Sequence, residues 1–269
     1  MTTGDLSGVG QTAFAVALAR ASEAGRGRPW FIDPVAVRLA AAVPQAAKER
    51  VGVGLTAWIA VRTRFLDELA LRTVGRGLKQ IVILGAGLDS RAFRLSLPDE
   101  VTLYEVDRAG VFAAKQRILR AAGLHSARRS EVIADALEVG WLDAAAIAGW
   151  RRGEPTLWIV EGYLMAFNAE TRTRIVTELA AASAVGSVLG ATVSTRIDLH
   201  NALWQPLDQA NVGDWLLECG WAAELTDMED ASKHYGRPLP SDTVERMNGV
   251  LIAARLIGDD TAFEEPDFD

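Results

Sequence analysis

Cysteine, histidine and tyrosine are scarce in this chain of 269 residues, which contains one, three and three of them respectively. The single thiol, Cys219, excludes an internal disulfide and a cysteine-based zinc site. It also fits a protein of the reducing cytoplasm, where we expect this chain to reside. The histidines, His125, His200 and His234, form no His-x-x-x-His pair, and no carboxylate cluster has metal-ligand spacing. We therefore expect no metal site.

Long apolar runs and excess positive charge are also lacking. Residues 1–5 show no basic segment leading into an apolar stretch, so we expect no signal peptide. Even the run Ile81–Ala86 stops at six residues, far short of a membrane span. The formal net charge of −7 gives no general attraction to phosphate backbones or anionic lipids. Neither nucleic acid nor a membrane is an expected partner.

The apolar pattern changes near residue 75. Before it, apolar residues recur at helical spacing over 11–24 and from Trp58 to about Val74, and Asp33-Pro34 is typical of a helix start. After it, short apolar runs typical of buried strands alternate with helical stretches such as 108–122 and 168–184. These runs are Gln80–Leu84, Val101–Val106, Glu131–Ala134, Thr156–Val160 and Ser187–Val193.

The end of the chain differs, with a helix over 214–219 and strand-like runs over 221–225 and 248–257. A late strand pair of this kind suits a sheet edge. We predict a single α/β domain over 1–269, in which a helical N-terminal cap reaches about residue 75. The part from about 76 onward is a parallel sheet with helices on both faces.

A glycine-rich turn follows the first predicted strand, in Gly85-Ala86-Gly87-Leu88-Asp89-Ser90-Arg91. Such a turn lets the backbone approach a ligand at the carboxyl end of the strand, although many turns use Gly-x-Gly for geometry alone. Ser90 stands where a dinucleotide site would have a third glycine or an alanine. This favours an adenosyl ligand without phosphate over a nicotinamide cofactor.

Acidic residues end the next two predicted strands. Asp107 follows Gly87 by 20 positions, the spacing at which a carboxylate accepts ribose hydroxyls, although it can instead cap the following helix. Asp135 follows the third strand and either accepts the adenine amino group or shapes a turn. Glycine, aspartate and aspartate at three successive strand ends together favour an adenosyl site.

The chain resembles the leucine carboxyl methyltransferase family, which includes methylesterifying enzymes of bacterial polyketide pathways and many actinobacterial S-adenosylmethionine-dependent methyltransferases. The succession Gly-x-Gly-Leu-Asp-Ser-Arg, Glu-x-Asp and Glu-Gly-x-Leu-Met is far more specific than a generic glycine turn. The stretches that carry the resemblance are Thr12–Glu23, Phe31–Ala36, Val61–Asp67, Gly85–Leu95, Tyr104–Asp107 and Glu161–Phe167, with looser support from Gly220-Trp221 and Tyr235–Arg237.

The resemblance implies a class I methyltransferase, Rossmann-like fold with a mostly parallel sheet of seven strands, the last antiparallel, and an N-terminal helical cap. It implies S-adenosylmethionine as cofactor, and the contacts follow residue by residue. Arg62 and Arg20 hold the methionine carboxylate, Gly85, Ala86 and Gly87 lie under methionine and ribose, Asp107 binds the ribose, Asp135 and Ala136 contact adenine, and Glu161 lies near the methionine amino group. Arg64 is two residues from Arg62 and so points elsewhere, as a solvated surface arginine.

For the acceptor, the resemblance implies a carboxylate oxygen of a small molecule, in secondary metabolism. A carboxylate is already ionised at neutral pH, whereas a phenol or alcohol usually needs a general base, for which His200 is the candidate. Tyr163 either places its phenol near the methyl group or packs the strand end. Arg196 either anchors a substrate carboxylate or forms a surface salt bridge. The residues also leave open a nicotinamide-dependent oxidoreductase and a protein that only binds the cofactor, and they do not determine the oligomeric state.

Overall fold

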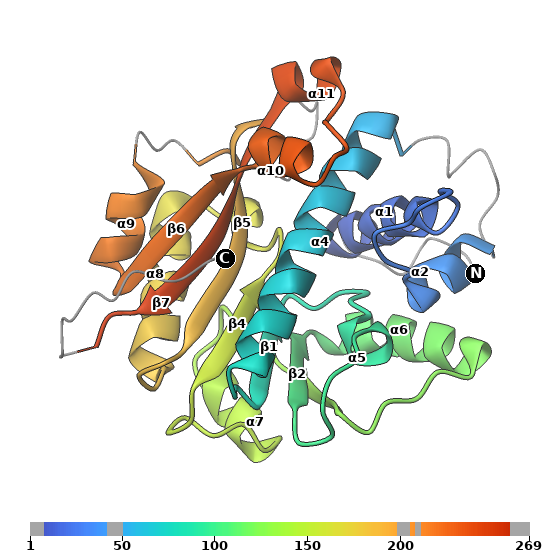
Figure 1. The fold of residues 1–269 in the computed structure, drawn as a ribbon. Coiled ribbons are helices and arrows are strands. Elements are labelled where there is room, and N and C mark those ends of the chain that lie inside the picture. Colours follow the sequence, from blue (N-terminus) through green and yellow to red (C-terminus); the bar gives the residue numbers. More distant parts are fainter. Residues whose placement is uncertain (1–7, 42–50, 198–204, 208–210, 259–269) are drawn as a thin grey trace.

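The computed structural model describes residues 8–41, 51–197, 205–207 and 211–258, and its centre is a seven-stranded sheet with the order β3-β2-β1-β4-β5-β7-β6 (Figure 1). The strands are β1 (Gln80–Leu84), β2 (Thr102–Asp107), β3 (Arg129–Ile133), β4 (Thr156–Val160), β5 (Val188–Ile197), β6 (Trp221–Asp227) and β7 (Met247–Leu256). Neighbours among β1 to β5 pair in parallel, whereas β7 runs antiparallel to both β5 and β6.

The predicted strands are confirmed, two of them (β1 and β4) with unchanged bounds. The prediction for β3 started two residues late, because Arg129 and Ser130 interrupt the apolar pattern. Arg129 pairs with Leu103 of β2, and its Nε donates at 2.7 Å to Glu105, a fully buried carboxylate on β2 that compensates its charge. The prediction for β5 stopped early, since the last residues of that strand are held by pairing with β7.

Helices cover both faces of the sheet. Their bounds are α1 (Gly8–Glu23), α2 (Pro34–Ala41), α4 (Val53–Gly75), α5 (Arg91–Arg94), α6 (Ala109–Ala122), α7 (Trp141–Ile147), the 3₁₀ turn η2 (Leu164–Ala166), α8 (Ala169–Ala182), α9 (Val212–Glu218), α10 (Met228–His234) and α11 (Ser241–Arg246). The start predicted at Asp33-Pro34 is confirmed, because the Asp33 carboxylate accepts the Ala36 amide at 2.8 Å. Among the described residues, no helix combines the length and apolarity that a bilayer crossing requires.

Alternating side chains of the strands build a separate hydrophobic core on each face. Val82 and Leu84 of β1 pack with the core that α7, α8 and α9 cover. Ile81 and Ile83 pack on the opposite side, against α4 and α10. In Figure 1, α4 lies across this second face and α1 and α2 lie beside it. The N-terminal helices are thus placed next to the edge at which the parallel strands end.

Candidate functional site

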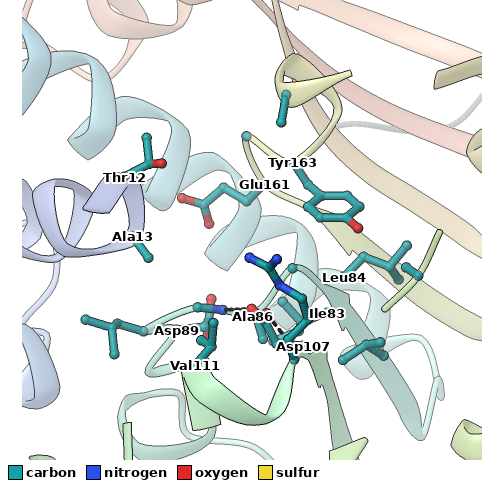
Figure 2. Close-up of a pocket in the computed structure, with 18 of the residues that line it drawn as sticks. Thr12, Ala13, Ile83, Leu84, Ala86, Asp89, Asp107, Val111, Glu161 and Tyr163 are labelled. Carbon is teal, nitrogen blue, oxygen red and sulfur yellow. Dashed lines mark hydrogen bonds between the residues drawn. The ribbon is translucent and has the colours of Figure 1, made fainter. Parts of the chain in front are cut away.

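A cavity of about 250 Å³ opens where the parallel strands end, with α1 on its far side (Figure 2). Thr12, Ala13, Val16 and Arg20 of α1 line it opposite the strand ends. It brings together every residue for which a cofactor contact was expected: Arg20, Arg62, Gly85, Ala86, Gly87, Asp107, Asp135, Ala136 and Glu161. Their grouping follows from topology, because parallel neighbouring strands end at the same edge of a sheet.

The glycines of the turn after β1 are required by the backbone and by the crowding around it. Gly85 and Gly87 have φ angles of 60° and 51°, in the left-handed region that side chains disfavour. A Cβ on Gly85 would lie 2.3 Å from Cδ2 of Tyr163, and a Cβ on Gly87 would lie 3.1 Å from Cβ of Ala13. The turn therefore exposes bare backbone to the cavity.

The Asp107 carboxylate is hydrogen-bonded to this turn. Its Oδ2 accepts the Gly87 amide at 2.7 Å, and its Oδ1 accepts the Arg108 amide at 2.8 Å. The N-cap residue of α6 is Arg108, so Asp107 lies one position before the cap and binds the amide of the cap residue. Burial raises the pKa of Asp107, although the two amides counteract this effect. Each carboxylate oxygen keeps acceptor capacity toward the cavity.

Asp135 shapes the turn after β3, as one of its two interpretations predicted. Its Oδ1 accepts the Leu137 amide at 3.0 Å, and its carbonyl accepts the Glu138 amide at 2.9 Å. The same residue also lines the cavity together with Ala136. A turn of this kind leaves the second carboxylate oxygen available, so the adenine contact stays a prediction.

Glu161, directly after β4, is the centre of a buried ion network. Its Oε1 accepts from Nη2 of Arg20 at 2.7 Å and from Nε of Arg62 at 3.0 Å, and its Oε2 accepts from Nη2 of Arg91 at 2.7 Å. Burial opposes the ionisation of this carboxyl group, but the surrounding guanidinium groups outweigh it and hold the Glu161 pKa well below its usual range. Glu161 therefore orients the arginines of the site.

The part of this network around Arg91 was not predicted from the sequence. Arg91 is fully buried and also binds Asp67, with 2.9 Å between Nε and Oδ1, and Asp89. Asp89 lines the cavity, and both residues stand in the Gly-x-Gly-Leu-Asp-Ser-Arg motif, which was interpreted as a ligand-binding turn and a family motif with no role for either side chain. The charged residue types in that motif were the available signal.

Arg62 lines the cavity and keeps one unsatisfied donor. Its side chain is 3% exposed, and its Nη1 is buried without a hydrogen-bond partner. Burial and the like charges of Arg20 and Arg91 lower the pKa of Arg62 to about 10, despite the attraction of Glu161. The side chain is thus still charged at neutral pH. A ligand carboxylate fits this donor, because an unpaired buried N–H is costly until an acceptor arrives.

Comparisons with known proteins agree with this geometry. The leucine carboxyl methyltransferase family matches residues 13–180, more than half of the chain. The chain belongs to this family. It is 36% identical to a Frankia alni protein named as an S-adenosyl-L-methionine-dependent methyltransferase, over 93% of this chain and 96% of that one. A Streptomyces avermitilis protein with the same description is 33% identical, over 93% and 96%. The chain is accordingly an S-adenosylmethionine-dependent methyltransferase, which removes the nicotinamide-dependent interpretation.

Solved structures show the same fold at low sequence identity. A Thermobifida fusca protein described as a methyltransferase aligns with a TM-score of 0.56 and 16% identity, covering 90% of this chain and 94% of that one. A DUF574 family protein of Streptomyces avermitilis aligns with a TM-score of 0.59 and 16% identity, covering 89% and 97%. The expected class I methyltransferase fold, with its mostly parallel sheet of seven strands, is confirmed.

Tyr163 lies over the glycine turn of this methyltransferase. Its ring contacts Phe167 edge to face, with 4.9 Å between ring centres, and packs against the core beneath β4. The packing that one interpretation predicted is therefore present, and the same ring lines the cavity (Figure 2). Burial raises the pKa of Tyr163, and the nearby carboxylates of Asp135 and Asp107 add to this effect. The phenol stays protonated at neutral pH, and its proximity to the methyl group stays a prediction.

The remaining predicted residues lie elsewhere. Arg196 is exposed on β5, donates to the carbonyl of Glu245 at 3.3 Å and does not line the cavity, so the structure does not bring it to the site. His200 lies outside the described residues. Arg64 meets the expectation of a solvated surface arginine only in part, since 29% of its side chain is exposed. It points away from the cavity as expected, but its guanidinium lies 4.0 Å from the ring centre of Tyr235 and 5.1 Å from that of Trp30.

Proposed function

We propose that this enzyme methylates a carboxylate oxygen of a small molecule, with a role in secondary metabolism. When bound, S-adenosylmethionine supplies an electrophilic methyl group on a positively charged sulfur. One observation carries the choice of a carboxylate: among the described residues no histidine, lysine or cysteine lines the cavity, and its carboxylates already bind the two turns and the arginines. A carboxylate acceptor is ionised at neutral pH and needs no base, whereas a hydroxyl usually does.

The cofactor contacts in this proposal use the groups that the fold leaves available. The unpaired Nη1 of Arg62 binds the methionine carboxylate, with Arg20 beside it. The free acceptor capacity of Asp107 binds the ribose hydroxyls, and Asp135 with Ala136 binds adenine. The bare backbone of the glycine turn allows close approach. These residues hold the cofactor, while Glu161 fixes the arginines rather than acting on the methyl group itself.

The acceptor side of the site is suited to alignment and to the exclusion of water. Ala13 and Val16 of α1 face the cavity from one side, and Tyr163, Ala166 and Phe167 face it from the loop after β4. Methyl transfer is an in-line displacement, so its rate depends mainly on how well acceptor oxygen, methyl carbon and leaving sulfur are aligned. The neutral Tyr163 phenol is able to donate a hydrogen bond but not to accept a proton.

The replacement His200→Ala tests the choice between acceptors. Purified enzyme is incubated with cofactor and matched sets of carboxylic acids and phenols, and S-adenosylhomocysteine formation is measured by mass spectrometry. Mild alkali then distinguishes the products, since it cleaves methyl esters and leaves methyl ethers intact. We expect an alkali-labile product and little change in rate for His200→Ala, as for the exposed control His125→Ala. An alkali-stable product with a loss of about 100-fold in the His200 variant would favour a hydroxyl acceptor.

A further inference from the structure

Two sequence stretches that carry the family resemblance, but that the catalytic proposal does not use, meet in the folded chain. Glu23 ends α1, and Tyr235 and Arg237 follow α10. Nη1 of Arg237 donates to both oxygens of the Glu23 carboxylate, at 2.7 and 2.8 Å, across 214 positions of sequence. Glu23 is fully buried, although carboxylates at helix ends are usually solvated. This contact therefore joins the N-terminal helices to the segment that follows α10.

Aromatic and cationic side chains enclose the pair. The Arg237 guanidinium lies 3.8 Å from the ring centre of Trp30, and its Nη2 donates to the Arg28 carbonyl at 3.0 Å. Arg64 of α4 lies against Trp30 and Tyr235, whose hydroxyl donates to Glu68 at 3.0 Å. Stacked guanidinium groups and a paired buried carboxylate form a specific arrangement. We call Glu23, Trp30, Arg64, Tyr235 and Arg237 the clasp.

The helix that enters the clasp also forms one wall of the cavity. Arg20, which binds Glu161 at 2.7 Å, precedes Glu23 by three positions and so lies on the same side of α1. Thr12, Ala13 and Val16, nearer the start of α1, line the cavity as well. A displacement of the α1 end therefore moves Arg20 relative to Glu161 and Arg62.

We propose that Glu23 and Arg237 are positioning residues for cofactor binding: the clasp sets the place of α1, and through it the place of Arg20 at the methionine end of the site. The inference rests on the proposed placement of the cofactor. Because the clasp places Arg20 in the site where the cofactor is proposed to bind, clasp formation and cofactor binding are linked reciprocally, and cofactor binding stabilises the clasp to the same extent.

The test measures binding of S-adenosylhomocysteine by calorimetry, without any acceptor, at a temperature at which circular dichroism shows each variant folded. We expect Arg237→Ala to raise the dissociation constant about 10-fold, within the usual range of coupling between sites. Arg237→Lys keeps a positive charge for Glu23 but loses the planar guanidinium group. Its dissociation constant should lie between those of the wild type and Arg237→Ala. The control Lys233→Ala removes an exposed α10 cation that pairs only with Glu229 and Asp230 in the described contacts, and should bind like wild type.

A wild-type measurement keeps the test independent of how the variants fold. The Trp30 amide donates to Glu23 at 2.7 Å, so its hydrogen exchange reports on the clasp. We expect S-adenosylhomocysteine to slow this exchange. Unchanged exchange, or a folded Arg237→Ala variant that binds as tightly as wild type, would overturn the proposal. Arg62→Gln serves as a reference for the cofactor placement. Unchanged affinity of this variant would refute that placement, whereas unchanged affinity of Arg237→Ala alone would refute only the role of the clasp.

Discussion

Replacing Glu161 by glutamine should be strongly destabilising, because it removes a carboxylate that Arg20, Arg62 and Arg91 share. Glutamine has nearly the same size but no charge, and its amide group adds donors where the network needs acceptors. Arg91 keeps Asp67 and Asp89, whereas Arg62 loses the only carboxylate that binds it among the described residues. The charge of Arg62 is then buried without compensation.

The expected size of the effect follows from this arrangement. Removing one partner of a buried ion pair costs about 3–5 kcal/mol, and the partners left to Arg91 favour the lower end. A loss of about 3 kcal/mol corresponds to a fall of about 6–12 °C in melting temperature for a protein of this size. Urea titration and thermal unfolding of the cofactor-free enzyme measure it. The control Glu224→Gln, on an exposed position of β6, should change stability by no more than about 0.5 kcal/mol.

The pH dependence gives an independent check. The folded-state pKa of Glu161 lies well below that of the unfolded chain, so the carboxylate contributes its full stabilisation above about pH 4.3. This contribution is lost as the pH falls through the folded-state pKa. The stability difference between wild type and Glu161→Gln should stay constant from neutral pH to about pH 5 and shrink below about pH 4. A difference under about 1 kcal/mol at neutral pH would refute the view that Glu161 holds the arginines.

Two further replacements test residues that line the cavity. Asp107→Ala should weaken S-adenosylhomocysteine binding about 10- to 100-fold, the loss expected for hydrogen bonds to a charged acceptor, and unchanged affinity in calorimetry would contradict the ribose assignment. Gly85→Ala should cost more than the roughly 1–2 kcal/mol of a left-handed backbone, because its Cβ would also lie 2.3 Å from Tyr163. Gly75→Ala, at the end of α4 with open space around it, is the matched control, and equal melting temperatures for the two variants would argue against this crowding.

The strands and the glycine turn were predictable from sequence because their signals are local. A buried strand such as β1 is a continuous apolar run, and the left-handed angles of Gly85 and Gly87 require a residue without a side chain. The bounds of β3 were harder to predict, since Arg129 is polar and its charge is compensated by Glu105 on the neighbouring strand. A charged residue at a strand end breaks the apolar pattern by which strands are predicted. The partner that compensates its charge lies elsewhere in the chain and is not evident from the local sequence.

The sequence by itself determined the family, the order of strands and helices, and the residues that end at one edge of the sheet. It determined them because apolar periodicity, glycine turns and short motifs involve neighbours in the chain. Only the tertiary structure decided how the charges are paired. Glu161 meets Arg91, Arg62 and Arg20 over separations of 70, 99 and 141 positions, and Glu23 meets Arg237 over 214. Charge pairing acts through space, so the unpaired donor of Arg62 and the clasp at the end of α1 can be recognised only in the folded chain.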